Sequence, residues 1–439
     1  MGGGHTHHSR LVFRMTAAHR LSAVAALSAL DAGSLSCEAL LRDCLDRIEE
    51  REAEVGAWQY LAKEAALQRA RAMDRDGRQG VLAGLPIGVK DLFDTYDMAT
   101  EYGSSIYAGH RPRTDAASVA AARLAGALLV GKTVTTEFAS YHPAKTRNPN
   151  NTAHTPGGSS SGSAAAVADF HVPLALGTQT AGSIIRPASF CGIVGYKPSF
   201  GLISRGGVKP FADSLDTVGV FGRSVEDVAL FASALSDRPE LRAAQRDTPP
   251  RIGLCRTYQW PSAAIETVRA VEGAGECLAA AGASVMDVQL TSSYVRLANA
   301  QNDVMTYEAA RALAFERHAH GEALSARLRE ILDGGRAVTA AQYDAALALF
   351  DECRRDLAQI LDGVDVLIAP STIGEAPAGV AATGDPLFNR IWSALGVPCI
   401  NLPGYFGDHG LPVGVQVIGA RGGDAFLLAN ATWMSYRLK

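Results

Sequence analysis

The chain has 439 residues, 47% of them hydrophobic and 20% charged, with 41 basic and 45 acidic side chains and a formal net charge of −4. This composition provides enough apolar material for a large folded core and excludes an acidic disordered protein. Because no basic stripe is present, it also argues against a nucleic-acid partner.

Seven scattered cysteines, none of them in a CxxC pair, bear on the cellular compartment. An odd number without paired spacing argues against a disulfide framework or a zinc site and favours a reducing environment. No apolar run reaches the roughly 18 residues that a membrane span needs, so no membrane partner is expected. We therefore predict a cytoplasmic protein.

The N-terminal region is predicted to hold a flexible tail followed by a helix. Residues 1–20 begin with a Gly- and His-rich stretch that is typical of a loose chain end. The apolar stretch 21–30 follows three arginines, which is a weak signal-peptide feature, but no clear cleavage site comes after it. We interpret 21–30 as an ordinary helix and place the folded domain at 21–439.

Helical and extended patterns alternate through the first half of the chain, as expected of an α/β sheet. In chain order, the predicted elements are helices over 21–30 and 36–77, a short buried strand over 87–89, a helix over 116–124 and a strand over 127–130. The alternation continues to about residue 235. The Gly-, Pro- and Ser-rich segment 142–163 interrupts it, and a loop of that length inside a compact domain is usually functional.

The second half of the chain changes character and then returns to the sheet. Residues 263–360 are more charged and follow a helical pattern, which predicts a mostly helical layer. Two apolar runs, 364–368 and 413–418, predict buried strands near the end. Because no repeat or low-complexity linker separates these parts, we expect one folded unit.

Two short motifs match known catalytic loops but lack the required context. Residues 126–133 match the phosphate-binding pattern GxxxxGK[ST], yet the four intervening residues are apolar and no strand precedes them. Residues 158–162 match GxSxG, the nucleophile elbow of α/β-hydrolases, yet the preceding polar segment cannot form a buried strand. We favour a structural interpretation of both.

Three longer segments form a far more specific pattern. They are Gly88-Val-Lys90-Asp91, Thr155-Pro-Gly-Gly-Ser159-Ser160-Ser161-Gly162 and Leu176-Gly-Thr-Gln-Thr-Ala-Gly-Ser183-Ile-Ile-Arg186-Pro187. Ser183 follows Ser159 by 24 residues. The set resembles the amidase signature family, and the resemblance runs from about residue 20 to the C-terminus. It implies a single-domain α/β fold in which a large, mixed and twisted β-sheet is covered by helices on both faces.

The resemblance also implies catalytic roles for three residues. Ser183 would be the nucleophile, Lys90 the base, and Ser159 the proton relay between them. The relay serine of the family contacts both partners and follows a cis peptide bond, which here would join Gly158 to Ser159. No metal or organic cofactor has a role in this chemistry.

The sequence around Lys90 suits a base. A lysine accepts a proton only when it is neutral. Burial away from other charges can lower the pKa of a lysine by several units and so favour the neutral form. Lys90 follows the apolar stretch 85–89, so a buried position is expected. On a strand, the neighbouring Asp91 points to the opposite face and need not keep Lys90 charged.

Backbone N–H groups of Thr180, Ala181, Gly182 and Ser183 are expected to bind the oxyanion of the tetrahedral intermediate, since small residues let the backbone approach closely. The chain departs from the family here. Many members have Asp where this chain has Gln179 and Gly where it has Ala181. Gln keeps the hydrogen-bonding capacity without the charge, so we expect altered support of the loop and an unchanged reaction class.

Several residues near this loop have weaker assignments. Arg186 is expected to orient the loop rather than bind substrate, and Asp216 to support the site rather than act in catalysis. Substrate contacts are predicted, by position and resemblance, at Gly158, Ser140, Tyr141, Ile391 and Trp392.

The predicted function is an amidase that cleaves a C–N bond through an acyl-enzyme on Ser183. The substrate class is open among amides, anilides, carbamates (urethanes) and ureas, because all pass through the same tetrahedral intermediate. The resemblance also covers the glutaminase subunit of tRNA-dependent amidotransferases, which ranks second, and a non-catalytic scaffold is the third alternative. We expect a small-molecule substrate and a monomer or homodimer.

Overall fold

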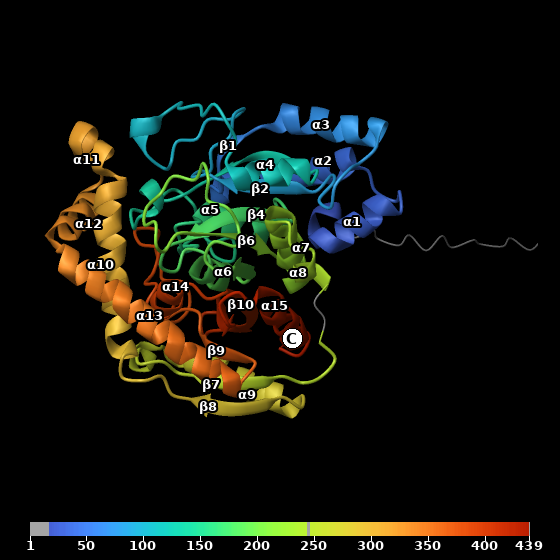
Figure 1. Ribbon diagram of the computed structural model, residues 1–439. Helices are drawn as coiled ribbons and strands as arrows, with labels where there is room; N and C mark the ends of the chain where they lie inside the picture. The colour runs from blue at the N-terminus through green and yellow to red at the C-terminus, as the bar shows by residue number, and fades with distance from the viewer. Residues whose placement is uncertain (1–16, 244–245, 439) are drawn as a thin grey trace, which may run out of the picture.

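A computed structural model describes residues 17–243 and 246–438 of the chain, and its centre is an 11-stranded sheet (Figure 1). The strand order is β1-β3-β2-β4-β6-β5-β10-β11-β9-β7-β8. The strands are β1 (Trp58–Leu61), β2 (Pro86–Lys90), β3 (Leu128–Thr133), β4 (Leu174–Gln179), β5 (Val194–Lys197), β6 (Thr217–Gly222), β7 (Arg251–Cys255), β8 (Ser284–Val288), β9 (Val366–Pro370), β10 (Cys399–Phe406) and β11 (Pro412–Ile418).

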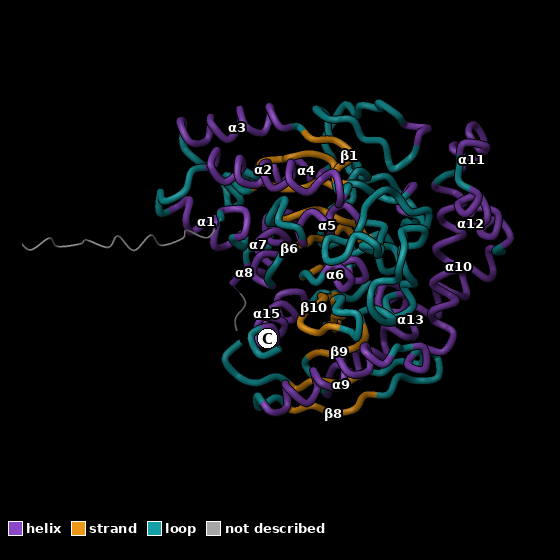
Figure 2. Tube along the Cα trace, turned by 180° about the vertical axis from the view of Figure 1, so that it is seen from behind, coloured by secondary structure: helices purple, strands orange, loops and turns teal. Residues whose placement is uncertain are grey.

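The sheet is mixed, as the family resemblance implies. Strand β2 runs parallel to both β3 and β4, and β7 runs parallel to both β8 and β9, while the central pairs from β4 to β9 are antiparallel. Every residue of β2, β4, β6, β9 and β11 is buried. Strands buried on both sides need cover on both faces, and helices supply it (Figures 1 and 2).

The α-helices among the described residues follow the strands along the chain. They are α1 (Ala23–Asp31), α2 (Cys37–Val55), α3 (Lys63–Asp76), α4 (Ala117–Leu124), α5 (Ser161–Ala168), α6 (Ile185–Cys191), α7 (Val225–Ser236), α8 (Glu240–Ala243), α9 (Ile265–Ala280), α10 (Tyr294–Ala312), α11 (Ala314–His320), α12 (Ala326–Ala337), α13 (Ala340–Gly363), α14 (Arg390–Leu395) and α15 (Asp424–Ser435). Short 3-10 turns lie at Ala18–Arg20, Ser105–Tyr107, Glu137–Ala139, Trp260–Ser262 and Gly321–Ala323. None of these helices is both long enough and apolar enough to cross a bilayer.

Helices α10–α13 form the predicted helical layer and gather at one side of the molecule (Figure 1). The prediction of helix over 263–360 misses β8, which lies at the sheet edge and exposes much of its length. Such an edge strand carries little apolar periodicity, which is why its pattern resembles a charged helical segment.

Two other predictions need correction. The helix expected over 36–77 is two helices separated by β1, because Gly56 adopts a left-handed conformation (φ 62°) and ends α2. The tail expected over 1–20 does not include its last residues: Ala18–Arg20 form a 3-10 turn, and the His19 backbone N–H donates to the Asp43 carboxylate at 2.7 Å. Residues 1–16 lie outside the described part of the chain.

Candidate active site

The site lies where β2 and β4 end. These strands are parallel neighbours, so their carboxyl ends, Lys90 and Gln179, reach the same edge of the sheet. Helix α5 precedes β4 and begins at Ser161, directly after the glycine-serine loop. Helix α6 begins at Ile185, directly after the turn that holds Ser183. The topology therefore brings all three predicted motifs to one place.

Lys90 is completely buried and is surrounded by hydroxyl groups. Its Nζ lies within hydrogen-bond distance of three hydroxyl oxygens, Ser159 Oγ at 2.8 Å, Ser160 Oγ at 2.9 Å and Thr178 Oγ1 at 2.8 Å. No carboxylate of the described residues lies within ion-pair distance of this amine. Burial lowers the pKa of Lys90 well below its usual value, and the charge of Asp216 opposes that shift in part.

Asp91, the next residue, is held away from Lys90 by a different lysine. Its buried carboxylate pairs with the buried Lys132 at 3.1 Å and accepts the Glu101 backbone N–H at 3.0 Å. This pairing on the opposite face of β2 follows from the alternation of side chains along a strand. The negative charge of Asp91 is thus neutralised by Lys132 and not by Lys90.

The two serines that contact Lys90 differ in their other bonds. Ser160 Oγ also donates to the Thr178 carbonyl at 3.2 Å and accepts the Thr178 backbone N–H at 3.3 Å. Ser159 Oγ has no second hydrogen bond among the described residues, so its proton is free to move. The peptide bond between Gly158 and Ser159 is cis, as the resemblance implies.

Ser183 lies on a tight turn between β4 and α6 and is 8% exposed. In the described part of the chain, the backbone N–H groups of Ala181, Gly182 and Ser183 donate to no protein acceptor. Unpaired backbone N–H groups are the kind of donor that stabilises an oxyanion. A side chain at Gly182 would collide with Asn389 Oδ1 and Pro386, so only glycine fits there.

The expected contact between the Ser159 and Ser183 hydroxyls is not formed in this structure, since no hydrogen bond among the described residues joins them. Catalytic hydrogen bonds often tighten only when substrate is bound. The geometry thus brings the two serines to one site without yet linking them.

The Gln179 side chain supports the turn that holds Ser183 through hydrogen bonds. Its Oε1 accepts the backbone N–H groups of Ile184 and Ile185 at 2.9 and 3.0 Å. Its Nε2 donates to Ser393 Oγ at 3.1 Å, and that hydroxyl donates to the Ala181 carbonyl at 2.7 Å. An aspartate could accept the same two N–H groups but could not donate to Ser393, so the amide ties the turn to α14 as well.

Asp216 supports the turn from another side. Its carboxylate accepts the Thr180 hydroxyl at 2.6 Å and the backbone N–H groups of Phe211 and Ala212 at 2.8 and 3.0 Å. Burial raises the pKa of this carboxyl group, and the Thr180 hydrogen bond opposes that shift. Asp216 thus orients the turn, in agreement with its predicted supporting role.

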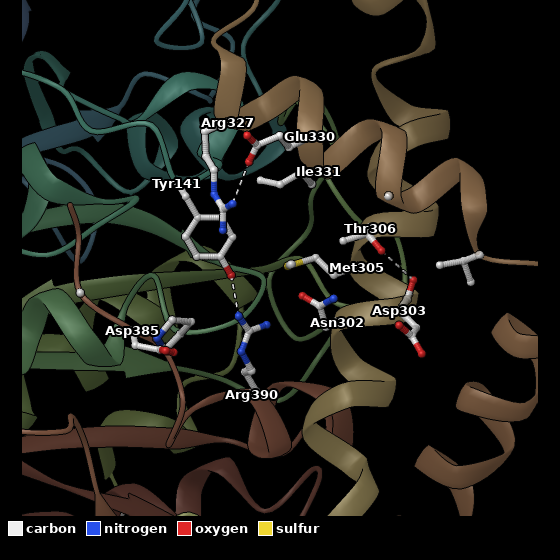
Figure 3. Close-up of a pocket in the computed structure, with 14 residues that line it drawn as sticks. Tyr141, Asn302, Asp303, Met305, Thr306, Arg327, Glu330, Ile331, Asp385 and Arg390 are labelled. Atoms are coloured by element: carbon white, nitrogen blue, oxygen red, sulfur yellow. Dashed lines mark hydrogen bonds and ion pairs between the residues drawn. The ribbon is translucent and has the colours of Figure 1, made fainter. Parts of the chain in front are cut away.

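A cavity of about 490 Å³ opens beside the turn, between α10, α12 and the segment before α14 (Figure 3). Its wall is polar, with Asp303 on α10, Arg327 and Glu330 on α12, and Asp385 and Arg390 near α14. Arg327 pairs with Glu330 at 2.9 Å. Pro386, which also lines this cavity, packs against Gly182 and so connects the cavity to the turn.

The structure separates the predicted substrate residues into two groups. Tyr141 lines the cavity, and its hydroxyl accepts from Arg390 Nη2 at 2.9 Å. Ile391 and Trp392 do not face it; they are 1% and 0% exposed and belong to the core. The helix turns the neighbouring Arg390 toward the cavity instead.

Ser140 and Gly158 lie within the protein rather than on the cavity wall. Ser140 is buried, and its carbonyl accepts the Thr136 hydroxyl at 2.7 Å. The Gly158 carbonyl accepts Arg186 Nη2 at 2.7 Å, so a side chain far from this loop in sequence occupies it. Both residues shape the loop around the site.

Sequence reasoning missed several members of the site. Thr178 and Ser160 contact Lys90, and Ser393 accepts a hydrogen bond from the Gln179 side chain. The polar residue at position 178, which follows the apolar start of strand β4, was a usable signal for Thr178. Ser393 lies 214 residues from Gln179, and no local pattern could have joined the two.

Comparisons with known proteins identify the family of this chain. A family model described as Amidase matches residues 39–428. The A subunit of glutamyl-tRNA(Gln) amidotransferase from Chloroflexus aggregans is 34% identical, over 94% of this chain and 96% of that protein. A crystal structure of an amidase superposes with a TM-score of 0.88 at 32% identity, covering 95% of this chain and 100% of that one. The 6-aminohexanoate cyclic dimer hydrolase with bound substrate gives 0.85 at 25% identity, covering 95% and 97%.

The fold and these likenesses define an enzyme that hydrolyses carbon–nitrogen bonds of amides. The chain belongs to the amidase family, of the amidase signature type.

Proposed function

We propose that this chain hydrolyses amide, anilide or carbamate bonds through an acyl-enzyme on Ser183, with Ser159 as the proton relay and Lys90 as the base. One observation carries the assignment: Lys90 is fully buried, has no carboxylate in ion-pair range, and its Nζ lies 2.8 Å from the Ser159 hydroxyl oxygen, within hydrogen-bond distance. Burial lowers the pKa of Lys90, more than the charge of Asp216 raises it, and this favours the neutral amine that a base requires.

In the proposed first half of the reaction, the proton moves from Ser183 to Lys90 through Ser159. The Lys90 amine takes the Ser159 hydroxyl proton while Ser159 takes the proton of Ser183. The Ser183 oxygen then attacks the substrate carbonyl carbon. The negative charge that develops on the carbonyl oxygen is stabilised by the unpaired N–H groups of residues 181–183, and losing one such donor commonly costs 100-fold or more in rate.

The second half returns the proton and frees the enzyme. The tetrahedral intermediate collapses, and Ser159 gives its proton to the leaving nitrogen while the Lys90 ammonium replaces it. The C–N bond breaks and an ester forms on Ser183. Water then attacks this ester by the same proton path, which releases the acid and restores the starting protonation.

The relay assignment makes a testable distinction between two adjacent serines. We expect Ser159→Ala to lower kcat by about 10²- to 10⁴-fold, the usual worth of a proton-transfer group. Ser160→Ala should cost about 10-fold or less, because the Ser160 proton is donated to the Thr178 carbonyl. Steady-state kinetics of both variants on one amide decide between them, and equal losses would contradict the relay assignment.

A panel of substrates tests the proposed function itself. Simple amides, anilides and carbamates, assayed for release of ammonia, amine or aniline, should show turnover in at least one class. Mass spectrometry should detect the matching acyl adduct on Ser183 during turnover of a slow substrate. Absence of both turnover and adduct across the panel would favour a non-catalytic scaffold.

A glutaminase role is the second candidate, because a relative 34% identical over 94% of the chain is the A subunit of glutamyl-tRNA(Gln) amidotransferase. As part of such an assembly, the chain would act with partner subunits and would meet tRNA through them. The two roles can be distinguished by comparing hydrolysis of glutamine with hydrolysis of the five-carbon dicarboxylic acid monoamide that lacks the amino group of glutamine. A strong preference for glutamine that is seen only when partner subunits are present would make the glutaminase role the better supported function.

A further inference from the structure

Three backbone N–H groups of the turn that holds Ser183, those of residues 181–183, are proposed to bind the oxyanion. Each of them shares a peptide unit with the carbonyl of the preceding residue, and the peptide bonds of the turn are trans. In a planar trans unit the C=O and N–H bonds point in opposite directions. A hydrogen bond from outside the turn to the carbonyl therefore fixes the direction in which the N–H of the same unit points.

Two of these carbonyls are held by helices that follow the turn in the sequence. The Gly182 carbonyl accepts the Arg186 backbone N–H at 3.0 Å at the start of α6. The Ala181 carbonyl accepts the hydroxyl of Ser393, which lies on α14, at 2.7 Å. The peptide units concerned end in the N–H groups of Ser183 and Gly182, so both N–H groups point away from the donors that hold their carbonyls.

The third carbonyl is held by a side chain of the helical layer. Gln301 lies on α10 and is completely buried, and its Nε2 donates to the Thr180 carbonyl at 3.2 Å. The N–H of this peptide unit belongs to Ala181, and it donates to no protein acceptor in the described part of the chain. A residue 121 positions away in the sequence thus fixes the direction of the first N–H group of the turn.

The orientation of the Gln301 amide group is determined by Arg390. The Gln301 Oε1 accepts Arg390 Nη1 at 2.8 Å, and Arg390 Nη2 donates to the Tyr141 hydroxyl at 2.9 Å (Figure 3). Because a guanidinium only donates hydrogen bonds, the amide oxygen must face it and the amide nitrogen must face the Thr180 carbonyl. Hydrogen bonds in such a chain also polarise one another, which strengthens the Ala181 N–H as a donor.

We propose that Gln301 and Ser393 are positioning residues of the reaction, which direct the N–H groups of Ala181 and Gly182 at the oxyanion from behind the turn. This inference rests on the proposed function. Oxyanion donors lower the barrier only when they point at the place where negative charge develops. Both side chains act through the backbone of the turn and not on the bound substrate, so their loss should lower kcat and leave KM nearly unchanged.

The test replaces Gln301 by glutamate and uses the amide that the wild-type enzyme hydrolyses fastest. The carboxylate has the same shape and still accepts from Arg390, but it presents an acceptor instead of a donor to the Thr180 carbonyl. Gln301→Glu should lower kcat by about 10- to 100-fold, because misdirecting one oxyanion donor costs less than removing it, which is worth about 10²- to 10³-fold. Steady-state kinetics should show little change in KM.

Asn430→Asp is the matched control, because Asn430 repeats the bonds of Gln301 at another place. It is a completely buried amide on α15, its Nδ2 donates to the Phe426 carbonyl at 2.7 Å, and its Oδ1 accepts Arg246 Nη1 at 3.1 Å. Neither bond reaches the Ser183 turn, so Asn430→Asp should leave kcat nearly unchanged. Equal losses of kcat in the two variants would overturn the inference, and so would a full kcat in Gln301→Glu.

A reversible inhibitor separates the direction of the N–H groups from the rest of the reaction. In an aldehyde analogue of the substrate, the Ser183 oxygen bonds to the aldehyde carbon, the C=O π bond breaks, and the serine proton passes through Ser159 to Lys90. The former carbonyl oxygen then carries the negative charge. Gln301→Glu should weaken the aldehyde by about the factor lost in kcat/KM and leave inhibition by the carboxylic acid product unchanged. Equal weakening of both ligands would contradict a positioning role.

Ser393→Ala covers the case in which Gln301→Glu fails to fold. It removes the donor to the Ala181 carbonyl, so kcat and aldehyde affinity should fall together while KM stays nearly constant. A change in KM alone, or no change in aldehyde affinity, would refute the inference and leave the proposed function in place. Lack of turnover of every amide by the wild-type enzyme, without an adduct on Ser183, would instead count against the proposed function.

Discussion

Ser183→Ala is expected to lower kcat by at least about 10⁴-fold, because it removes the attacking oxygen while the unpaired N–H groups of the turn remain. Ser183 makes no side-chain hydrogen bond among the described residues, so the change should leave the stability of the fold nearly unaltered. Product-release assays give the rate. A fluorophosphonate probe, followed by intact mass, should add one adduct to the wild type and none to the variant.

The matched control for this experiment is Ser161→Ala. Ser161 is a buried serine at the start of α5, and its hydroxyl makes one long hydrogen bond, 3.4 Å, to the Val134 carbonyl. This variant should keep both the label and most of the activity. Labelling that persists in Ser183→Ala would assign the nucleophile to another residue.

Lys90→Met is expected to lower kcat by at least about 10³-fold, since methionine keeps the length of the side chain but cannot take a proton. The same base sets the pH dependence. A protonated lysine has no lone pair, so activity should fall as the pH drops through the lowered pKa of Lys90 and level off above it. The acid limb should disappear from any residual activity of Lys90→Met, and a variant that retains it would refute the base assignment.

Stability measurements on a second buried lysine provide the control. Lys132 pairs with Asp91 at 3.1 Å, so Lys132→Met leaves a buried carboxylate alone and should lower the free energy of unfolding by about 3–5 kcal/mol. Lys90 has no such partner, and Lys90→Met should cost less. Urea denaturation of both variants checks this order, and the reverse order would show that Lys90 is held as a structural cation.

Much of the fold and the centre of the site could be predicted from sequence. Long apolar periodicities predicted the alternation of helix and strand, and the three signature segments predicted that Lys90 and Ser159 meet. Side-chain alternation along β2 correctly predicted that Asp91 faces away from Lys90. These features depend on local pattern or on a motif of fixed spacing.

Features set by distant packing could not be predicted in this way. Ile391 and Trp392 were assigned to substrate by position, but the rotation of α14 buries both and exposes Arg390 to the cavity. Strands β1 and β8 were missed because each is short and lies at an edge of the sheet. Edge strands need only one buried face and so carry a weak apolar signal.

The amide of Gln179 has a consequence for how this enzyme responds to acid. A carboxylate in its place would gain a proton at low pH and change its bonds to Ile184 and Ile185, whereas an amide group does not titrate. The Gln179 bonds to this side of the catalytic turn are therefore independent of pH. Of Gln179 and Asp216, which both support the turn, only Asp216 can gain a proton in acid, and burial raises the pKa of its carboxyl group.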